Sequence, residues 1–131
     1  MRVSLPLILA LAAAGIAAPA ASIDRSTAEE RFAKLTAGLI PGEPIQCINE
    51  RLPATQVEAV GSRLIYKVNR KLVYVNETAG GCEAVARGDA LVTNSFGTRL
   101  CRGDTSRTVD LSTNATTGSC AFGLFIPYRA P

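Results

Sequence analysis

Four cysteines, Cys47, Cys82, Cys101 and Cys120, are the residues whose chemistry this sequence specifies most clearly. An even number of cysteines in a small chain is typical of disulfides, whereas zinc sites use close Cys-x-x-Cys pairs or histidines. The sequence has neither a Cys-x-x-Cys pair nor any histidine. We therefore expect two disulfides, and no metal or other cofactor.

Three pairings of these cysteines are possible, and we predict Cys47–Cys120 together with Cys82–Cys101. The first pair lies in apolar segments near the two ends of the domain, where a bond would close a small sheet. The second pair lies beside turns, at positions that suit the two ends of one loop. Loop-closure entropy is similar for all pairings, so geometry must decide. The sequential pattern, Cys47–Cys82 with Cys101–Cys120, is the main alternative.

Groups that could support catalysis are few. Without histidine, a Ser–His or Cys–His nucleophile pair is impossible. The sequence also lacks Ser-x-x-Lys and glycine-rich phosphate-binding motifs. Asp89 and Asp104 could act as acid and base only if they faced each other across a cleft. We expect them to form turns instead, and we expect no enzymatic activity.

Both aspartates end an Arg-Gly-Asp triplet, at residues 87–89 and 102–104. Such a triplet on an exposed turn is an adhesion motif. It is also what turn chemistry produces, because glycine supplies backbone freedom and aspartate bonds nearby backbone groups. We favour the turn interpretation for both. The glycan acceptor patterns at Asn76 and Asn114 are interpreted as chance matches.

Six aromatic residues could line a small-ligand pocket, but a chain with 5% aromatic residues needs most of them for its core. We therefore expect a core role for these residues, which are Tyr66, Tyr74, Phe96, Phe122, Phe125 and Tyr128.

Residues 1–20 have the features of a signal peptide. Arg2 precedes an apolar run, and Ala18-Pro19-Ala20 supplies small residues at the cleavage positions. The run is shorter than the roughly 20 residues that a membrane span needs. We expect cleavage after Ala20, export to the periplasm or beyond, and no transmembrane anchor afterwards.

The rest of the chain is long enough for one domain with a modest core. The formal net charge is +3, and the only tight basic group is Lys67, Arg70 and Lys71. This distribution does not indicate a nucleic-acid binder. We expect a monomer that binds an envelope protein or a small ligand.

The predicted elements are one helix followed by short strands. Ala28, Phe32, Leu35 and Leu39 give a helical stripe within residues 22–40, and a Pro/Gly turn then completes the segment 21–44. Residues 45–131 form the predicted disulfide-stapled β domain. Its main feature is a hairpin over residues 62–76, with Asn69-Arg70 as the turn. Leu64 would then face Val75, and Tyr66 would face Val73.

Further strands are predicted at residues 45–48, 90–96, 99–101, 105–111 and 120–126. Those at 90–96 and 99–101 would form a second hairpin, whereas residues 49–61 are ambiguous. Ser112–Ser119 has the composition of a loop. Residues 120–126 would be a central buried strand that Pro127 ends. The expected class is mainly β, a small antiparallel sheet or barrel of five to six short strands with one N-terminal helix.

Three short motifs follow Cys47 in order, namely YVN with the later Cys82, LCRGD, and CAFGLFIPY. This order resembles a family of small exported proteobacterial proteins of unknown function. The resemblance covers most of the chain after the signal peptide. It implies a periplasmic or envelope location in a Gram-negative bacterium, and it brings no catalytic residue or cofactor.

Two functions fit these observations. The first is a non-enzymatic binding or envelope-associated module that uses loops held by disulfides. The second is an inhibitor of a secreted hydrolase that acts through the loop Ser112–Ser119, which precedes Cys120.

Overall fold

A computed structural model describes residues 20–49, 56–94 and 97–131. This part of the chain is mainly β, with antiparallel sheets, an N-terminal helix and two disulfides, so the predicted class is confirmed. Most of the predicted signal peptide and Phe96 lie outside the described residues. In chain order the elements are α1 (Ala20–Leu35), β1 (Ile40–Pro41), β2 (Cys47–Asn49), β3 (Gln56–Val60), β4 (Arg63–Asn69), β5 (Leu72–Glu77), the 3-10 helix η1 (Glu83–Arg87), β6 (Ala90–Asn94), β7 (Arg99–Cys101), β8 (Thr105–Val109), β9 (Thr116–Ala121) and β10 (Phe125–Arg129).

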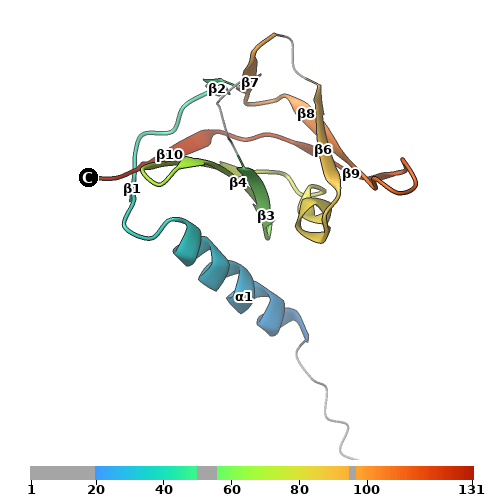
Figure 1. The fold of residues 1–131 in the computed structure, drawn as a ribbon, viewed down its shortest axis with the longest axis horizontal. Helices are drawn as coiled ribbons and strands as arrows, with labels where there is room; N and C mark the ends of the chain where they lie inside the picture. Colours follow the sequence, from blue (N-terminus) through green and yellow to red (C-terminus); the bar gives the residue numbers. More distant parts are fainter. Residues whose placement is uncertain (1–19, 50–55, 95–96) are drawn as a thin grey trace, which may run out of the picture.

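A five-stranded sheet, in the order β1-β10-β5-β4-β3, forms the middle layer of the molecule (Figure 1). Helix α1 covers one face of this sheet. On the other face lie the two-stranded sheet β2-β7 and the three-stranded sheet β6-β8-β9. Each face of the middle sheet has its own buried cluster of apolar side chains.

The apolar stripe of α1 is confirmed. Ala28, Phe32, Leu35 and Leu39 pack against a buried cluster formed by Val60, Ile65, Val73 and Val75. The helix ends at Leu35, earlier than predicted, and a turn follows in which Gly38 has a φ of 73°. Glycine adopts this left-handed conformation without steric cost, which explains the end of the helical segment.

The predicted hairpin forms, but its register is wrong by one residue. The turn lies one residue later than predicted, because Asn69 pairs with Leu72, and the Asn69 side chain accepts a hydrogen bond from the Lys71 N–H at 2.7 Å. A bulge between Lys67 and Asn69 then takes back one residue of this shift, so that Tyr66 pairs with Tyr74 and Leu64 pairs with Asn76. A bulge absorbs one residue on one strand only. As a result, Val73 and Val75 lie on the helix side of the sheet and not beside Leu64.

The predicted strand 120–126 is also wrong. Strand β9 ends at Ala121, the chain turns at Phe122–Leu124, and β10 begins at Phe125. Pro127 lies inside β10 and pairs with Tyr74. The Pro127 carbonyl accepts a hydrogen bond from the Gly42 N–H, so the position without an N–H faces the short edge strand β1. A proline is tolerated there because only an edge hydrogen bond is lost.

The second predicted hairpin does not form, because β6 pairs with β8 and β7 pairs with β2. The ambiguous segment 49–61 contributes β3, an edge strand whose first described residue is Gln56. Strand β9 starts at Thr116, so the loop predicted at Ser112–Ser119 is shorter than expected and lies before Thr116.

The predicted disulfide pairing is wrong, and so is its sequential alternative. The disulfides join Cys47 to Cys101 and Cys82 to Cys120. Cys47 and Cys101 are direct register partners in the β2-β7 sheet. Cys82 precedes η1 and meets Cys120 on β9, with the buried Ser106 hydroxyl 3.3 Å and 3.0 Å from the two sulfur atoms. The prediction that a bond between Cys47 and Cys120 closes the sheet is therefore also wrong.

Candidate functional site

A buried side chain binds the backbone of the corner at Phe122–Leu124, between β9 and β10. Asn76 on β5 is fully buried. Its amide NH₂ donates to the Gly123 carbonyl at 2.8 Å and to the Leu124 carbonyl at 3.4 Å, and its carbonyl oxygen accepts from the Gly123 N–H at 3.0 Å. The amide thus replaces the strand pairing that the backbone lacks at this corner.

Glycine is required at position 123 because two backbones approach closely there. A Cβ on Gly123 would lie 2.5 Å from the Glu77 carbonyl oxygen, closer than real Cβ contacts allow. Any larger residue would push the corner away from β5 and from the Asn76 amide.

A tight turn packs against this corner from a second part of the chain. In the turn, the Asp104 carboxylate accepts a hydrogen bond from the Cys101 N–H at 2.8 Å, and Gly103 has a φ of 88°. The Gly103 N–H donates to the Phe122 carbonyl at 2.9 Å, and the Phe122 N–H donates to the Asp104 carbonyl at 3.0 Å. The turn and the corner therefore form one rigid unit.

A third segment, residues 42–46, completes the arrangement. Ile45 exchanges both backbone hydrogen bonds with Phe125, and the Gln46 carbonyl accepts from the Arg102 N–H at 2.8 Å. The Cys47–Cys101 disulfide links this segment to the turn covalently. Three stretches that are distant in sequence are thus fixed around Phe122–Leu124.

A groove of about 350 Å³ opens where these segments meet. This volume is at the lower end of the range for small-ligand sites. Apolar side chains form most of its wall, and one acidic and one basic residue stand beside them. The lining residues are Pro44, Glu77, Arg102, Gly123, Leu124 and Ile126.

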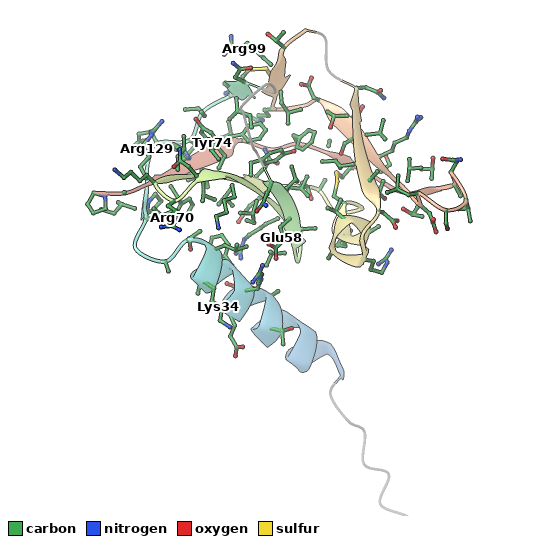
Figure 2. All side chains as sticks on the ribbon, in the orientation of Figure 1. Lys34, Glu58, Arg70, Tyr74, Arg99 and Arg129 are labelled. Carbon is green, nitrogen blue, oxygen red and sulfur yellow. A yellow bond between two sulfur atoms is a disulfide. The ribbon has the colours of Figure 1, made fainter. Side chains whose placement is uncertain are left out.

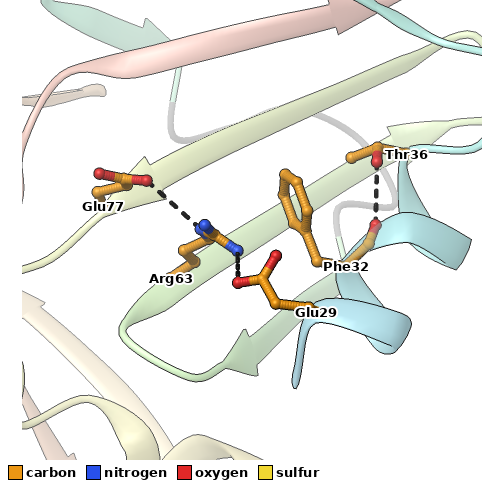
Figure 3. A network of polar contacts seen from close by, with 5 residues as sticks. All are labelled: Glu29, Phe32, Thr36, Arg63 and Glu77. Carbon is orange, nitrogen blue, oxygen red and sulfur yellow. Dashed lines mark hydrogen bonds and ion pairs between the residues drawn. The ribbon is translucent and has the colours of Figure 1, made fainter. Parts of the chain in front are cut away.

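The two charged residues of the groove are not equivalent. Glu77 forms an ion pair with Arg63 at 3.4 Å, and Arg63 forms a second ion pair with Glu29 of α1 at 2.9 Å (Figure 3). The Arg63 guanidinium also lies 4.4 Å from the centre of the Phe32 ring. Arg102, in contrast, is exposed, and no ion pair involves it within the described part of the chain. The groove therefore presents the Arg102 guanidinium beside an apolar surface, together with the Glu77 carboxylate, which shares Arg63 with Glu29.

The two predicted turns at Arg-Gly-Asp are confirmed. Gly88 ends η1 in a left-handed conformation, and the Asp89 carboxylate accepts a hydrogen bond from the Thr117 hydroxyl. Asp104 has the turn role described above. The Asp104 carboxylate thus holds its own turn, whereas the Asp89 carboxylate binds Thr117 of the distant strand β9, and the two share no hydrogen-bond partner among the described residues.

The described aromatic residues of this set do not line a common pocket. Tyr66, Phe122 and Phe125 belong to the cluster on the inner face of the middle sheet. Tyr128 lies on the helix side, where its ring meets Phe32 edge to face with 5.9 Å between the ring centres. Figure 2 shows side chains filling the space between the sheet layers. The expected core role is confirmed for the described aromatic residues.

The loop between β8 and β9 is a second candidate site, because it exposes a large apolar side chain. Leu111 is 70% exposed. The Asp110 carboxylate accepts hydrogen bonds from the Ser112 hydroxyl at 2.6 Å, the Ser112 N–H at 2.7 Å and the Thr113 N–H at 3.3 Å. The hydrogen bonds from Ser112 lower the pKa of the Asp110 carboxyl, because they favour its ionised form.

Sequence reasoning missed the groove and Leu111, although the signal for the groove was present. Asn76 ends the YVN motif, Gly103 and Asp104 end LCRGD, and Gly123 lies in CAFGLFIPY. These three motifs meet at one corner of the structure. A search for what the motifs could contact, rather than what each could do alone, would have indicated this site.

Comparisons of the chain with protein-family models, curated proteins and solved structures find no match. No helix in the described residues is long and apolar enough to cross a membrane. The described residues also contain no group of three or more side chains placed to hold a metal ion.

Proposed function

We propose that this protein is a non-enzymatic binding module whose site is the groove beside Arg102. The observation that carries the proposal is the Arg102 side chain, which forms no ion pair with any described residue and lies at the rim of an apolar groove built on a hydrogen-bonded corner. A preformed site limits the entropy lost on binding. The surrounding hydrogen bonds and the Cys47–Cys101 disulfide supply that preorganisation.

The ligand class follows from the groove lining. Pro44, Leu124 and Ile126 favour an apolar group, and Arg102 favours a carboxylate, because a guanidinium binds carboxylates through paired hydrogen bonds. Glu77 stands in the same lining and disfavours a ligand with several negative charges. We therefore assign the groove to an apolar molecule or segment that carries one carboxylate.

The proposed location is the periplasm or the cell exterior. Two disulfides in so small a chain are typical of oxidising compartments, and the first 20 residues have the composition of a signal peptide. Intact-mass measurement of the protein from fractionated cells tests this. A mature chain that begins at or within two residues of Ala21 in the periplasmic or secreted fraction is expected, and a membrane-bound chain that retains residue 1 contradicts it.

The groove is tested with three probes that share an eight-carbon chain: octanoate, octanol and octylamine. NMR shifts of the Leu124 and Ile126 methyl groups report on binding. For ligands of this size we expect a Kd of about 1–10 mM for octanoate, with weaker binding of octanol and the weakest of octylamine. Equal shifts with octanoate and octylamine would contradict the role of Arg102, and absence of any shift would remove the groove as the site.

The chain offers a matched control for Arg102. Arg102→Gln and Arg87→Gln remove the arginine from the two Arg-Gly-Asp turns, but only Arg102 lines the groove. We expect Arg102→Gln to weaken octanoate binding roughly 3-fold, as for an exposed ion pair, and to leave octanol binding unchanged. Arg87→Gln should leave both unchanged.

Leu111 favours a second candidate function, inhibition of a secreted hydrolase. The candidate element is the loop around Leu111, not the predicted Ser112–Ser119, because β9 includes Thr116 onward. The Asp110 hydrogen bonds hold the loop before any partner binds, and Leu111 could then enter an apolar pocket of the enzyme.

Residual activity of purified secreted proteases and glycosidases, measured with excess protein, tests this candidate. Leu111→Ala should abolish any inhibition. Ile40→Ala is the matched control, because Ile40 is the other large apolar side chain that is strongly exposed among the described residues, at 57%. Inhibition that survives Leu111→Ala, or none across the panel, would reject the loop as an inhibitory element.

A further inference from the structure

The open edges of the sheets differ in how they are protected. Exposed edge strands invite pairing with other chains, and proteins usually block them with charge, proline, short length or a covering segment. Strand β1 has two residues and ends in Pro41. Strand β3 carries Glu58, whose carboxylate is paired with Arg31 of α1. On β9, the Ala121 carbonyl accepts from the Ala79 N–H, and Gly81 lies against the Ser119 backbone.

Strand β6 shows none of these protections among the described residues. Its sequence, ALVTN, contains no charge and no proline, and it pairs regularly with β8 along all five residues. It forms an edge of the three-stranded sheet (Figure 1). Among the described residues, β8 is the sole strand paired with β6, and no other backbone hydrogen bond involves residues 90–94. Within the described part of the chain, one side of β6 therefore has backbone donors and acceptors that no neighbouring strand pairs with.

We propose that β6 pairs with β6 of a second copy of this chain, antiparallel about a two-fold axis at Val92. In this register Val92 meets Val92 of the second copy, Leu91 meets Thr93, and Ala90 meets Asn94. No charged residue meets another, so the edge is complementary to itself, as a two-fold interface must be. Leu91 and Thr93 are both partly exposed in one copy, and the pairing would cover them further.

The contact is small, because five residues on each side bury less surface than a stable interface needs. The expected product is therefore a dimer that forms at high concentration, while the dilute protein is a monomer as the sequence predicts. This dimer is independent of the groove, because no residue of β6 lines it.

Sedimentation velocity from about 5 µM to about 1 mM tests the pairing over the range expected for a weak dimer. The wild-type protein should pass from monomer to dimer within this range. Val92→Lys and Val92→Glu should each remain monomeric, because each places two like charges at the two-fold axis. An equimolar mixture of the two variants should form dimers again, and this recovery also shows that both are folded.

Thr116→Lys is the matched control, because Thr116 is an exposed residue of β9, away from the β6 edge. This variant should dimerise like the wild type. Hydrogen exchange of the wild-type protein adds a measurement without a mutation, since exchange of the residue 90–94 amides should slow between the two concentrations. A wild-type protein that stays monomeric to 1 mM, or a mixture of the Val92 variants that does not dimerise, would overturn the proposal.

Discussion

The two faces of the five-stranded sheet are covered in different ways. The outer face is covered by α1, a local element whose apolar stripe is visible in the sequence. Its buried residues are aliphatic, and most of the side chains packed against them, including Phe32 and Tyr128, are only partly buried. The inner face is covered by β2 and by segments from the second half of the chain, and it contains both the buried disulfide and the stacked Phe122 and Phe125 rings. The face built from distant segments is therefore the more buried one, whereas the groove also includes Ile126, which packs on the helix side of the sheet.

The cost of a mutation should follow this difference. Outer-face helix residues such as Phe32 keep contact with water, whereas Phe125 and Leu64 on the inner face are fully buried. The ion pairs that hold α1 to the sheet are largely exposed, so water screens them. Substitutions on the inner face should therefore be the most destabilising.

The largest effect is expected for Phe125→Ala. Phe125 is fully buried, and its ring meets Tyr66 and Phe122 with ring centres 6.0 Å and 6.1 Å away. Truncation of a buried aromatic residue lowers the free energy of unfolding by about 3–5 kcal/mol. Lys71→Ala, at the exposed hairpin turn, should change it by less than about 0.5 kcal/mol. Equal shifts of the urea midpoint for the two variants would show that the core lies elsewhere.

A somewhat smaller loss, about 2–4 kcal/mol, is expected for Asn76→Ala. The mutation leaves the Gly123 N–H and its carbonyl buried without the amide that binds them. Asn76→Asp keeps the shape but replaces the donor by a buried carboxylate that faces the Gly123 and Leu124 carbonyls, so it should cost at least as much. Both variants should also broaden the Leu124 methyl signals of the groove. A variant as stable as the wild type would show that the corner does not depend on this amide.

Phe32→Ala on the helix face should cost less, about 1–2 kcal/mol, because the Phe32 side chain is partly exposed and loses less buried area. Its contacts are the Tyr128 ring and the Arg63 guanidinium. Chemical denaturation measures the loss, and a cost equal to that of Phe125→Ala would erase the difference between the two faces. Ala33→Ser, on the exposed side of α1, is the control and should have little effect.

The two faces also differ in how well they could be predicted from the sequence. The prediction of the apolar stripe of α1 was correct, because helix periodicity depends on neighbouring residues only. The hairpin register failed because one bulged residue moves every later side chain to the opposite face. The disulfide pairing was predicted wrongly and the groove was missed, because both depend on which distant strands pair. No local signal in the sequence indicates that β2 pairs with β7.

The smallest expected effect concerns pH and the loop around Leu111, which lies outside both faces. Hydrogen bonds from Ser112 lower the pKa of the Asp110 carboxyl in the folded protein. A lowered folded-state pKa means that these hydrogen bonds stabilise the loop above the unfolded value of about 3.9, and that this stabilisation is lost as the pH falls through the folded-state value. NMR titration of the Asp110 carboxyl should therefore show a midpoint below about 3.9, and the Ser112 and Thr113 amides should exchange faster only below it.

Ser112→Ala removes the hydroxyl donor and should move the midpoint of the Asp110 titration back toward the ordinary value, whereas Thr116→Ala should not. An Asp110 midpoint that Ser112→Ala leaves unchanged would show that the loop is not held by this carboxylate, and Leu111 would then lose the rigid support on which the inhibitor candidate depends.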